Sequence, residues 1–494
     1  MINDSLLSYR RFKSDRCIMY AVTFMKLLLG CNAMLIKKVK DKKKQNTEKK
    51  AYSMFRVSRI VNRVLSLLVF STLLIAHSAQ AQISNANTLP PIITLLLKEN
   101  PLEQNPCPQI TPSSANVITG SVQITSQADL DALSDVTHIE GNLEFTSSIP
   151  SSLDFSPLGS LVEINALIIN STPLEELSGF NCLATVSGSL TIISNDFLTS
   201  FSGFNSLESI SALFVVVENG SLREFNGFSS LESIGAAFLI QENENLREFN
   251  GFNSLESIGA TFQIRQNENL TGFNGFNSLE FIAEDLRIEQ NENLTELNDF
   301  NSLRTVHDFE IIDNQSLNNI DGFNSLESVS ENFEIIDNRS LNKIDGFNSL
   351  ESVSENFEIT ENINLTEIGG FNSIASIVEK FQIRQNENLT ELNGFNSLRT
   401  VADFEIDDNQ SLNKINGFNS LESVSGHFEI TENINLTEIG GFQNLSLEGT
   451  NFSVINDNSS YDCSANPVPN FVPLNAVQQN FSTGNAVNCL AAEQ

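Results

Sequence analysis

Acidic side chains recur in this sequence at a fixed spacing and could bind cations or basic groups. Glu310, Glu334 and Glu358 lie 24 residues apart, and Asp313 and Asp337 each follow one of them by three positions. Regularly spaced carboxylates attract basic partners, and calcium takes roughly six to eight oxygen ligands. No D-x-D-x-D-type loop is present, so calcium is only a weak alternative. Its candidate ligands are Asp313, Asp337 and Asp408, and no other cofactor is expected.

Catalytic patterns are absent from the sequence. Beyond residue 81 the histidines are His138, His307 and His427, and they stand at unrelated positions. There is no G-x-S-x-G, no H-E-x-x-H and no paired Cys/His cluster. Catalysis needs a unique group of a positioned acid, base or nucleophile. The sequence therefore predicts no catalytic residue and a protein that is not an enzyme.

A repeat of 23 or 24 residues positions the carboxylates, and it occurs eleven times between Leu190 and Phe428. The consensus of the copies is F-x-I-x-x-N-x-x-L-x-x-(F/I/L)-x-G-F-N-S-L-x-x-(I/V). A period of this size is typical of a solenoid, in which each unit buries its apolar side against its neighbours. In Phe-x-Ile, alternation points Phe and Ile inward and the residue between them outward. The pattern predicts a mainly β solenoid of about 12–15 coils.

The outward positions of the Phe-x-Ile strand are the one surface that the sequence nominates for binding. Carboxylates at these positions should stack in register from coil to coil. Arg265 with Glu289, and Arg384 with Asp407, are expected to form salt bridges between coils. The predicted ligand-binding face comprises Glu310, Glu334, Glu358, Glu405, Glu429, Asp407, Ile312 and Ile336.

One asparagine recurs inside every copy of the repeat. A buried polar residue must be hydrogen-bonded, and an amide can bond both turn backbone groups and the equivalent amide in the next coil. The sequence therefore predicts a structural ladder. Its members are Asn195, Asn219, Asn243, Asn267, Asn291, Asn314, Asn338, Asn362, Asn386, Asn409 and Asn433.

The first part of the chain reads as a targeting segment. Residues 54–81 combine Arg56, Arg59 and Arg63 with an apolar run and an Ala-Gln-Ala site, which is typical of a signal peptide cleaved between Ala81 and Gln82. Residues 1–53 are then predicted to be a non-native, disordered extension. Residues 82–116 are expected to form a linker, 117–455 the solenoid and 456–494 a C-terminal cap.

The net charge limits the kinds of molecule that this protein can bind, and the cysteines bear on the cellular compartment in which it folds. Residues 1–81 hold 16 Lys and Arg and 4 Asp and Glu, so residues 82–494 hold 12 and 57, a net charge of −45. Such a surface repels nucleic acid and attracts basic partners. Secretion permits disulfides. Cys463–Cys489 is the expected pair in the cap, whereas Cys107 and Cys182 are left open, since Cys182 could also be a small buried residue.

The start of the repeat region resembles the opening of receptor L-domain repeats. The resemblance is carried by Gly120-Ser121-Val122-Gln123-Ile124, by Asp129-Leu130 and by Thr137-x-Ile139-x-Gly141-x-Leu143. The later I-x-x-N-x-x-L units resemble the same family, which is related to leucine-rich repeats. The resemblance covers roughly residues 117–455. It implies a right-handed, β-helix-like solenoid and non-enzymatic roles in ligand binding or at the cell surface. Because a Cys-rich module, a transmembrane helix and a kinase are missing, a signalling receptor is not expected.

These observations favour a secreted or cell-surface protein that binds a ligand or mediates adhesion through its acidic face. The expected partner is an extracellular protein or glycan, and a basic one would suit the charge, with no nucleic acid and no transmembrane anchor. The main alternative is a structural envelope or matrix protein without a discrete ligand. A polysaccharide-active β-helix enzyme is less favoured, because an anionic polysaccharide would be repelled by this surface.

Overall fold

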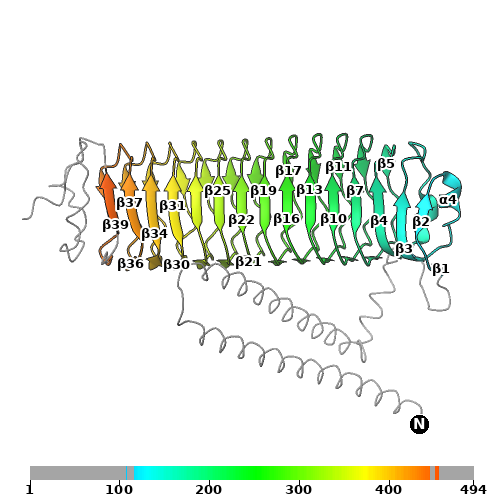
Figure 1. Cartoon of the computed structure of the whole chain (residues 1–494), viewed down its shortest axis with the longest axis horizontal. Helices are drawn as coiled ribbons and strands as arrows, with labels where there is room; N and C mark the ends of the chain where they lie inside the picture. Colours follow the sequence, from blue (N-terminus) through cyan, green and yellow to red (C-terminus); the bar gives the residue numbers. More distant parts are fainter. Residues whose placement is uncertain (1–106, 108–115, 446–450, 456–494) are drawn as a thin grey trace, which may run out of the picture. The chain divides into compact units, whose positions relative to one another are not determined.

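Residues 116–445 form a column of stacked β-coils, seen in a computed structural model (Figure 1). The structure describes Cys107, residues 116–445 and the backbone of 451–455. Four of the predictions above lie outside these residues: the extension 1–53, the signal peptide with its Ala81–Gln82 site, the cap 456–494 and the Cys463–Cys489 pair. The linker 82–116 also lies outside them, apart from Cys107 and Asn116.

One ladder of long parallel strands runs the length of the column. Each strand pairs with its equivalent in the next coil, mostly one repeat of about 24 residues away. The fold prediction is thus confirmed in its essentials: a mainly β solenoid of about 13 turns. The ladder comprises β3 (His138–Phe145), β4 (Glu163–Asn170), β7 (Leu190–Ile193), β10 (Phe214–Val217), β13 (Phe238–Gln241), β16 (Phe262–Arg265), β19 (Leu286–Glu289), β22 (Phe309–Ile312), β25 (Phe333–Ile336), β28 (Phe357–Thr360), β31 (Lys380–Arg384), β34 (Asp403–Asp407), β37 (His427–Thr431) and β39 (Asn451–Ile455).

A second ladder of two-residue strands precedes the long strands in each coil and shares their sheet. The two ladders meet in β3 and β4, each of which spans both positions as one continuous strand. Later coils bend between the two positions. The short strands are β6 (Thr185–Val186), β9 (Ser209–Ile210), β12 (Ser233–Ile234), β15 (Ser257–Ile258), β18 (Phe281–Ile282), β21 (Thr305–Val306), β24 (Ser328–Val329), β27 (Ser352–Val353), β30 (Ser376–Ile377), β33 (Thr400–Val401) and β36 (Ser423–Val424).

A third set of two-residue strands follows the long strands and forms separate sheets of five, four and three strands. The first sheet holds β5 (Glu176–Leu177), β8 (Ser200–Phe201), β11 (Glu224–Phe225), β14 (Glu248–Phe249) and β17 (Gly272–Phe273). The second holds β20 (Glu296–Leu297), β23 (Asn319–Ile320), β26 (Lys343–Ile344) and β29 (Glu367–Ile368). The third holds β32 (Glu391–Leu392), β35 (Lys414–Ile415) and β38 (Glu438–Ile439).

The N-terminal end of the column departs from the repeat. Strands β1 (Val117–Ile118) and β2 (Val122–Ile124) both pair with β3. A one-turn helix, α4 (Gln127–Asp131), lies beyond β2 at the cyan end of the column and buries Leu130 in the core (Figure 1). A 3-10 turn, η1 (Ser156–Ser160), follows. Together these segments cover the apolar end that the first coil would otherwise expose.

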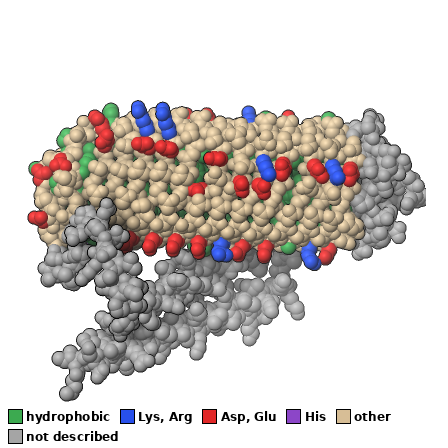
Figure 2. Space-filling model, turned by 180° about the vertical axis from the view of Figure 1, so that it is seen from behind, with side chains coloured by type: hydrophobic (Ala, Val, Ile, Leu, Met, Phe, Trp, Pro, Cys, Tyr) green, Lys and Arg blue, Asp and Glu red, His purple; other side chains and the backbone are tan. Residues whose placement is uncertain are grey.

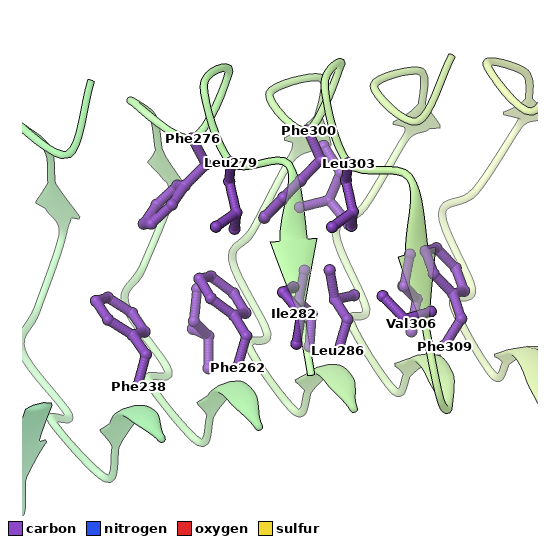
Figure 3. Packing of buried hydrophobic residues seen from close by; sticks show 14 of the residues in the cluster. Phe238, Phe262, Phe276, Leu279, Ile282, Leu286, Phe300, Leu303, Val306 and Phe309 are labelled. Atoms are coloured by element: carbon purple, nitrogen blue, oxygen red, sulfur yellow. The ribbon is translucent and has the colours of Figure 1, made fainter. Parts of the chain in front are cut away.

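Rows of stacked phenylalanine rings fill the core. The Gly-Phe corner supplies one row from Phe180 to Phe442, with 4.9 to 5.6 Å between the centroids of successive rings. The long strands supply a second row, in which Leu286 stands between Phe262 and Phe309 (Figure 3). The rows meet edge to face, as between Phe309 and Phe323 at 4.8 Å. Both geometries are favourable for aromatic pairs.

The asparagine ladder forms as expected. In each link the side-chain oxygen of one Asn accepts from the backbone and side-chain N–H groups of the Asn one coil before. For Asn267 and Asn291 both distances are 3.2 Å. The same Nδ2 also donates to the carbonyls of Ile240 and Arg265. All eleven side chains are buried, so the ladder supplies the polar partners that burial requires.

The residue before each ladder Asn takes a left-handed conformation, with φ between 51° and 60°. Glu242, Gln266 and Asp313 all hold this position. A left-handed residue turns the chain sharply, so the corner of the coil begins at this residue.

Two further features complete the fold. Where Asp299 replaces the corner Gly, its carboxylate accepts hydrogen bonds from the backbone N–H groups of Gly275 and Phe276 in the preceding coil.

Cys107 and Cys182, whose pairing the sequence left open, are joined by a disulfide with a Cα–Cα distance of 5.2 Å. The bond closes a loop of 75 residues onto the early coils.

Candidate functional site

The long-strand face carries the predicted carboxylates in register. Glu310 of β22 pairs with Glu334 of β25, and Glu334 pairs with Glu358 of β28. Gln382 occupies the next rung, and Glu405 and Glu429 continue beyond it in β34 and β37. Like charges directly opposite each other destabilise a sheet. The register therefore concentrates negative charge on adjacent rungs at a cost in stability.

Burial changes the chemistry of Glu310. The neighbouring rungs shield its side chain, which is only 12% exposed. Burial raises the pKa of Glu310 to about 8, which the Arg287 guanidinium opposes and a hydrogen bond with Glu289 reinforces. Near neutral pH this carboxyl therefore retains a proton for much of the time.

Glu334 lies between two other carboxylates. Burial raises its pKa, and repulsion from Glu358 adds to the shift. No Lys or Arg among residues 116–445 lies within ion-pair distance of Glu334 or Glu358. These two side chains are consequently adjacent rungs without a basic partner, and Glu429 farther along the face also has none among the described residues.

Basic residues neutralise other parts of the face. Arg287 bonds Glu310 at 3.1 Å and also reaches Asp285 and Asp308. Lys380 pairs with Glu405 at 2.8 Å. The guanidinium of Arg287 thus holds one end of the carboxylate row, and Lys380 occupies a place farther along it.

Both salt bridges expected between coils are present. Arg265 lies 3.6 Å from Glu289, and Arg384 lies 3.1 Å from Asp407. Asp407 also accepts a hydrogen bond from the Thr431 hydroxyl at 2.6 Å. Asp407, nominated from the sequence as a ligand contact, is therefore already engaged within the fold.

The three aspartates considered for calcium lie at the left-handed corners. Asp337 pairs with Arg339 at 3.0 Å, while Gln315 and Gln410 donate hydrogen bonds to Asp313 and Asp408. Within the described part of the chain, no group of three or more His, Cys, Asp or Glu side chains is arranged to hold a metal ion. The geometry gives no support to a calcium site there.

Two apolar residues interrupt the charged face. Ile312 and Ile336 pair directly in β22 and β25, one position beyond an inward Ile in each strand. Both are half-buried. They form a small apolar step beside the Glu310–Glu334 rungs, so the predicted apolar and acidic positions do adjoin.

Acidic rows are not confined to the long-strand face. Figure 2 shows the opposite side of the column, where Asp and Glu side chains line up along its length and Lys or Arg interrupts them. Outside the long strands, Arg304 pairs with Glu327 at 2.8 Å, and Lys343 pairs with Glu367 at 3.3 Å. Any test of the long-strand face thus needs a control on another acidic row.

The histidines lie in separate places. His138 is in β3 and His427 in β37, while His307 lies between β21 and β22. His138 contacts the Thr137 hydroxyl at 2.8 Å and approaches Glu163 at 3.9 Å. The structure brings the three rings into no common site among the described residues. No described helix is long and apolar enough to cross a membrane.

Comparisons with known proteins give remote likenesses. No protein-family model matches the sequence, and no curated protein does. A solved leucine-rich repeat protein from Bacteroides ovatus is 15% identical, with 70% of this chain and 97% of that chain covered and a TM-score of 0.17. A leucine-rich cell surface protein from Faecalibacterium prausnitzii is 12% identical, with 56% and 88% covered and a TM-score of 0.12.

A third solved structure, a TLR13–ssRNA13 complex, is 13% identical, with 68% of this chain and 80% of that chain covered and a TM-score of 0.11. At such TM-scores these likenesses carry no argument about this chain. Its class rests instead on its own parallel ladders and repeated core. These make it a β-solenoid with repeats of about 24 residues, as the sequence pattern predicted.

Proposed function

We propose that this protein is a secreted or cell-surface binding protein that holds a basic partner on its long-strand face without catalysing a reaction. The observation that supports this proposal is the pair Glu334 and Glu358. They occupy adjacent rungs, and no Lys or Arg of residues 116–445 lies within ion-pair distance of either. A partner's ammonium or guanidinium group would supply the missing charge.

Placement outside the cell rests on two further observations. Residues 54–81 carry the signal-peptide pattern. The disulfide Cys107–Cys182 is of a kind that persists in oxidising compartments. An extracellular partner, protein or glycan, with exposed basic groups fits this placement.

The raised pKa values make binding and protonation interdependent. A cation bound beside Glu334 favours the ionised forms of Glu334 and of its neighbour Glu310, whose pKa values burial raises, so binding should release protons. Affinity for a basic partner should therefore rise about three- to tenfold from pH 6 to pH 9, with proton release near neutral pH.

The test uses the purified protein and an octalysine peptide, with the fully acetylated peptide as the uncharged control. Calorimetry in buffers of different ionisation enthalpy reports the affinity and the protons released. Changing both Glu334 and Glu358 to Gln should weaken binding by up to about thirtyfold, since each close charge pair contributes up to roughly 1 kcal/mol.

The matched control changes Glu256 and Glu351, which lie outside the long strands, to Gln. Both pairs of substitutions remove two negative charges, so a difference between them isolates the long-strand face. Equal losses in the two variants, or binding that never saturates, would reject the proposal. Such a result would instead favour a structural envelope protein with an acidic coat.

A further inference from the structure

A hollow of about 380 Å³ opens at one corner of the early coils. Three successive coils line it, and the lining consists of Ser147, Ser171, Thr172, Pro173, Ser194, Asp196 and Phe197. Small-molecule sites typically measure roughly 300–1,000 Å³ and combine apolar surface with a few polar groups. The hollow has the size and the mixed lining of such a site, and none of its residues belongs to the long-strand face proposed above.

A shortened corner creates the hollow. In the regular coils, two residues separate the ladder Asn from the next buried Leu, as between Asn195 and Leu198. In the preceding coil only Pro173 separates Thr172 from the buried Leu174. One residue is therefore missing from this corner, and a gap is left beside the coil that follows.

Thr172 completes the ladder at this point in place of Asn. Its backbone N–H and its hydroxyl both donate to the side-chain oxygen of Asn195, at 3.0 and 2.8 Å. Thr172 is buried, so the floor of the hollow is fixed by the same ladder that orders the rest of the column. The hollow is thus part of the folded framework.

Phe197 forms the rim and is 61% exposed. Every later coil from Ser221 to Asn435 places Ser or Asn in this slot, and several of these Asn side chains bond the coil before, as Asn245 bonds the Gly220 carbonyl. Phe197 makes no such bond. The protein exposes a large apolar ring at the one regular corner that borders the hollow.

The polar groups of the lining mostly accept hydrogen bonds. The hydroxyls of Ser171 and Ser194 already donate, to Asn170 and Glu218, which leaves their oxygens as acceptors. No group among residues 116–445 donates to the carboxylate of Asp196, which is exposed. A ligand that donates several hydrogen bonds from hydroxyl groups would match this lining.

From these features we infer that the hollow binds a neutral saccharide. The negatively polarised face of the Phe197 ring attracts the C–H groups on one face of a sugar ring. The sugar hydroxyls then donate to Asp196 and to the serine oxygens. The lining contains Asp196 and no basic residue, which disfavours anionic sugars. This inference does not depend on the proposed binding of a basic partner.

The test screens the full-length protein against neutral hexasaccharides of the cello, laminari, manno and chito series, by saturation-transfer NMR followed by calorimetry. At least one series should bind saturably. Phe197→Ser installs the residue found in other coils, so folding should be retained, and it should weaken binding at least about tenfold. Phe197→Tyr keeps the ring and should stay within about threefold of the natural protein.

Two further variants distinguish the hollow from the rest of the protein surface. Combining Phe197→Ser with Ser221→Phe moves the ring to a corner without the hollow and should not restore binding. Changing Glu334 and Glu358 to Gln should leave saccharide affinity unchanged even if binding of octalysine is lost. The inference is overturned if no neutral hexasaccharide binds, if Phe197→Ser binds as well as the natural protein, or if only anionic saccharides bind.

Discussion

Among single residues, Glu310 shows most clearly how the fold alters side-chain chemistry. Its pKa rises to about 8 from an ordinary 4.5 because neighbouring rungs shield it from water. The folded protein therefore holds a proton that the unfolded chain releases between these two pH values. By linkage, the stability of the folded state must fall as pH rises through this interval.

We expect Glu310→Gln to remove most of this pH dependence. In the natural protein, the free energy of unfolding should fall by about 1–2 kcal/mol between pH 4.5 and pH 9, a figure reduced for solvent screening of a partly exposed group. Urea denaturation at the two pH values measures the difference. Glu351→Gln, on another row, should leave the slope unchanged, and an equal slope in Glu310→Gln and the natural protein would contradict the assignment.

For single residues, the sequence predicted the positions of side chains on the strands better than it predicted their ion-pair partners. The 24-residue spacing was enough to place Glu310, Glu334 and Glu358 in one column. It also predicted Arg384 beside Asp407, because each holds the same slot in adjacent coils. Lys380 reaches Glu405 from a different slot, and that contact depends on side-chain length and strand twist, which spacing alone does not contain.

Among structural elements, the corner after each long strand carries backbone strain. Every ladder Asn follows a residue with positive φ, and none of these residues is glycine. A left-handed conformation costs a non-glycine residue roughly 1–2 kcal/mol. The eleven corners from Ser194 to Glu432 therefore lower the stability of the folded state, and substitutions that relieve the strain should raise it.

Glu242→Gly should release part of that strain. Its φ is 53° and its side chain is exposed, so we expect the protein to gain up to about 1 kcal/mol in the free energy of unfolding. Glu244, two residues on, is not among the residues with positive φ. Glu244→Gly should therefore destabilise by about 0.5–1 kcal/mol, and thermal denaturation that ranked the two variants in the opposite order would refute the argument.

The sequence pattern could not show these corners. The Phe-x-Ile pattern defines the strand only as far as the residue after Ile, and only the backbone trace shows that the chain turns at the next residue, directly before the Asn. The hollow beside Phe197 was missed for a related reason, because the shortened Thr172–Leu174 corner lies in a degenerate coil. Aligning the coils slot by slot would have revealed both the missing residue and the unusual Phe.

Across the whole molecule, each coil contacts only its neighbours, so stability is the sum of local units and the interfaces between them. The asparagine ladder crosses every one of these interfaces from Asn195 to Asn433. A break in its middle should therefore have a different consequence from a break at its end.

We expect Asn314→Ala to uncouple the column into two parts. The change orphans the backbone N–H of Asn291. It also removes the side-chain hydrogen bonds to Asn291 Nδ2 and to the carbonyls of Ile288 and Ile312, at a total cost of about 3–5 kcal/mol. Asn433→Ala, near the end of the ladder, should only increase fraying. Hydrogen exchange should then show two separately opening blocks in the first variant and loss of protection in the last coils alone in the second.

Because the strand register is the same at every rung, the number of coils in the column can change without altering the contacts between coils. Removing or adding one whole coil would join edges that are chemically equivalent, so no new contact would have to be invented, and the column would change by roughly 4.8 Å. Residues 291–330 and 386–425 are near copies of each other, as expected when a gene pairs out of step with itself during recombination. Recombination can thus lengthen or shorten the column by whole coils, while the chemistry of each coil stays the same.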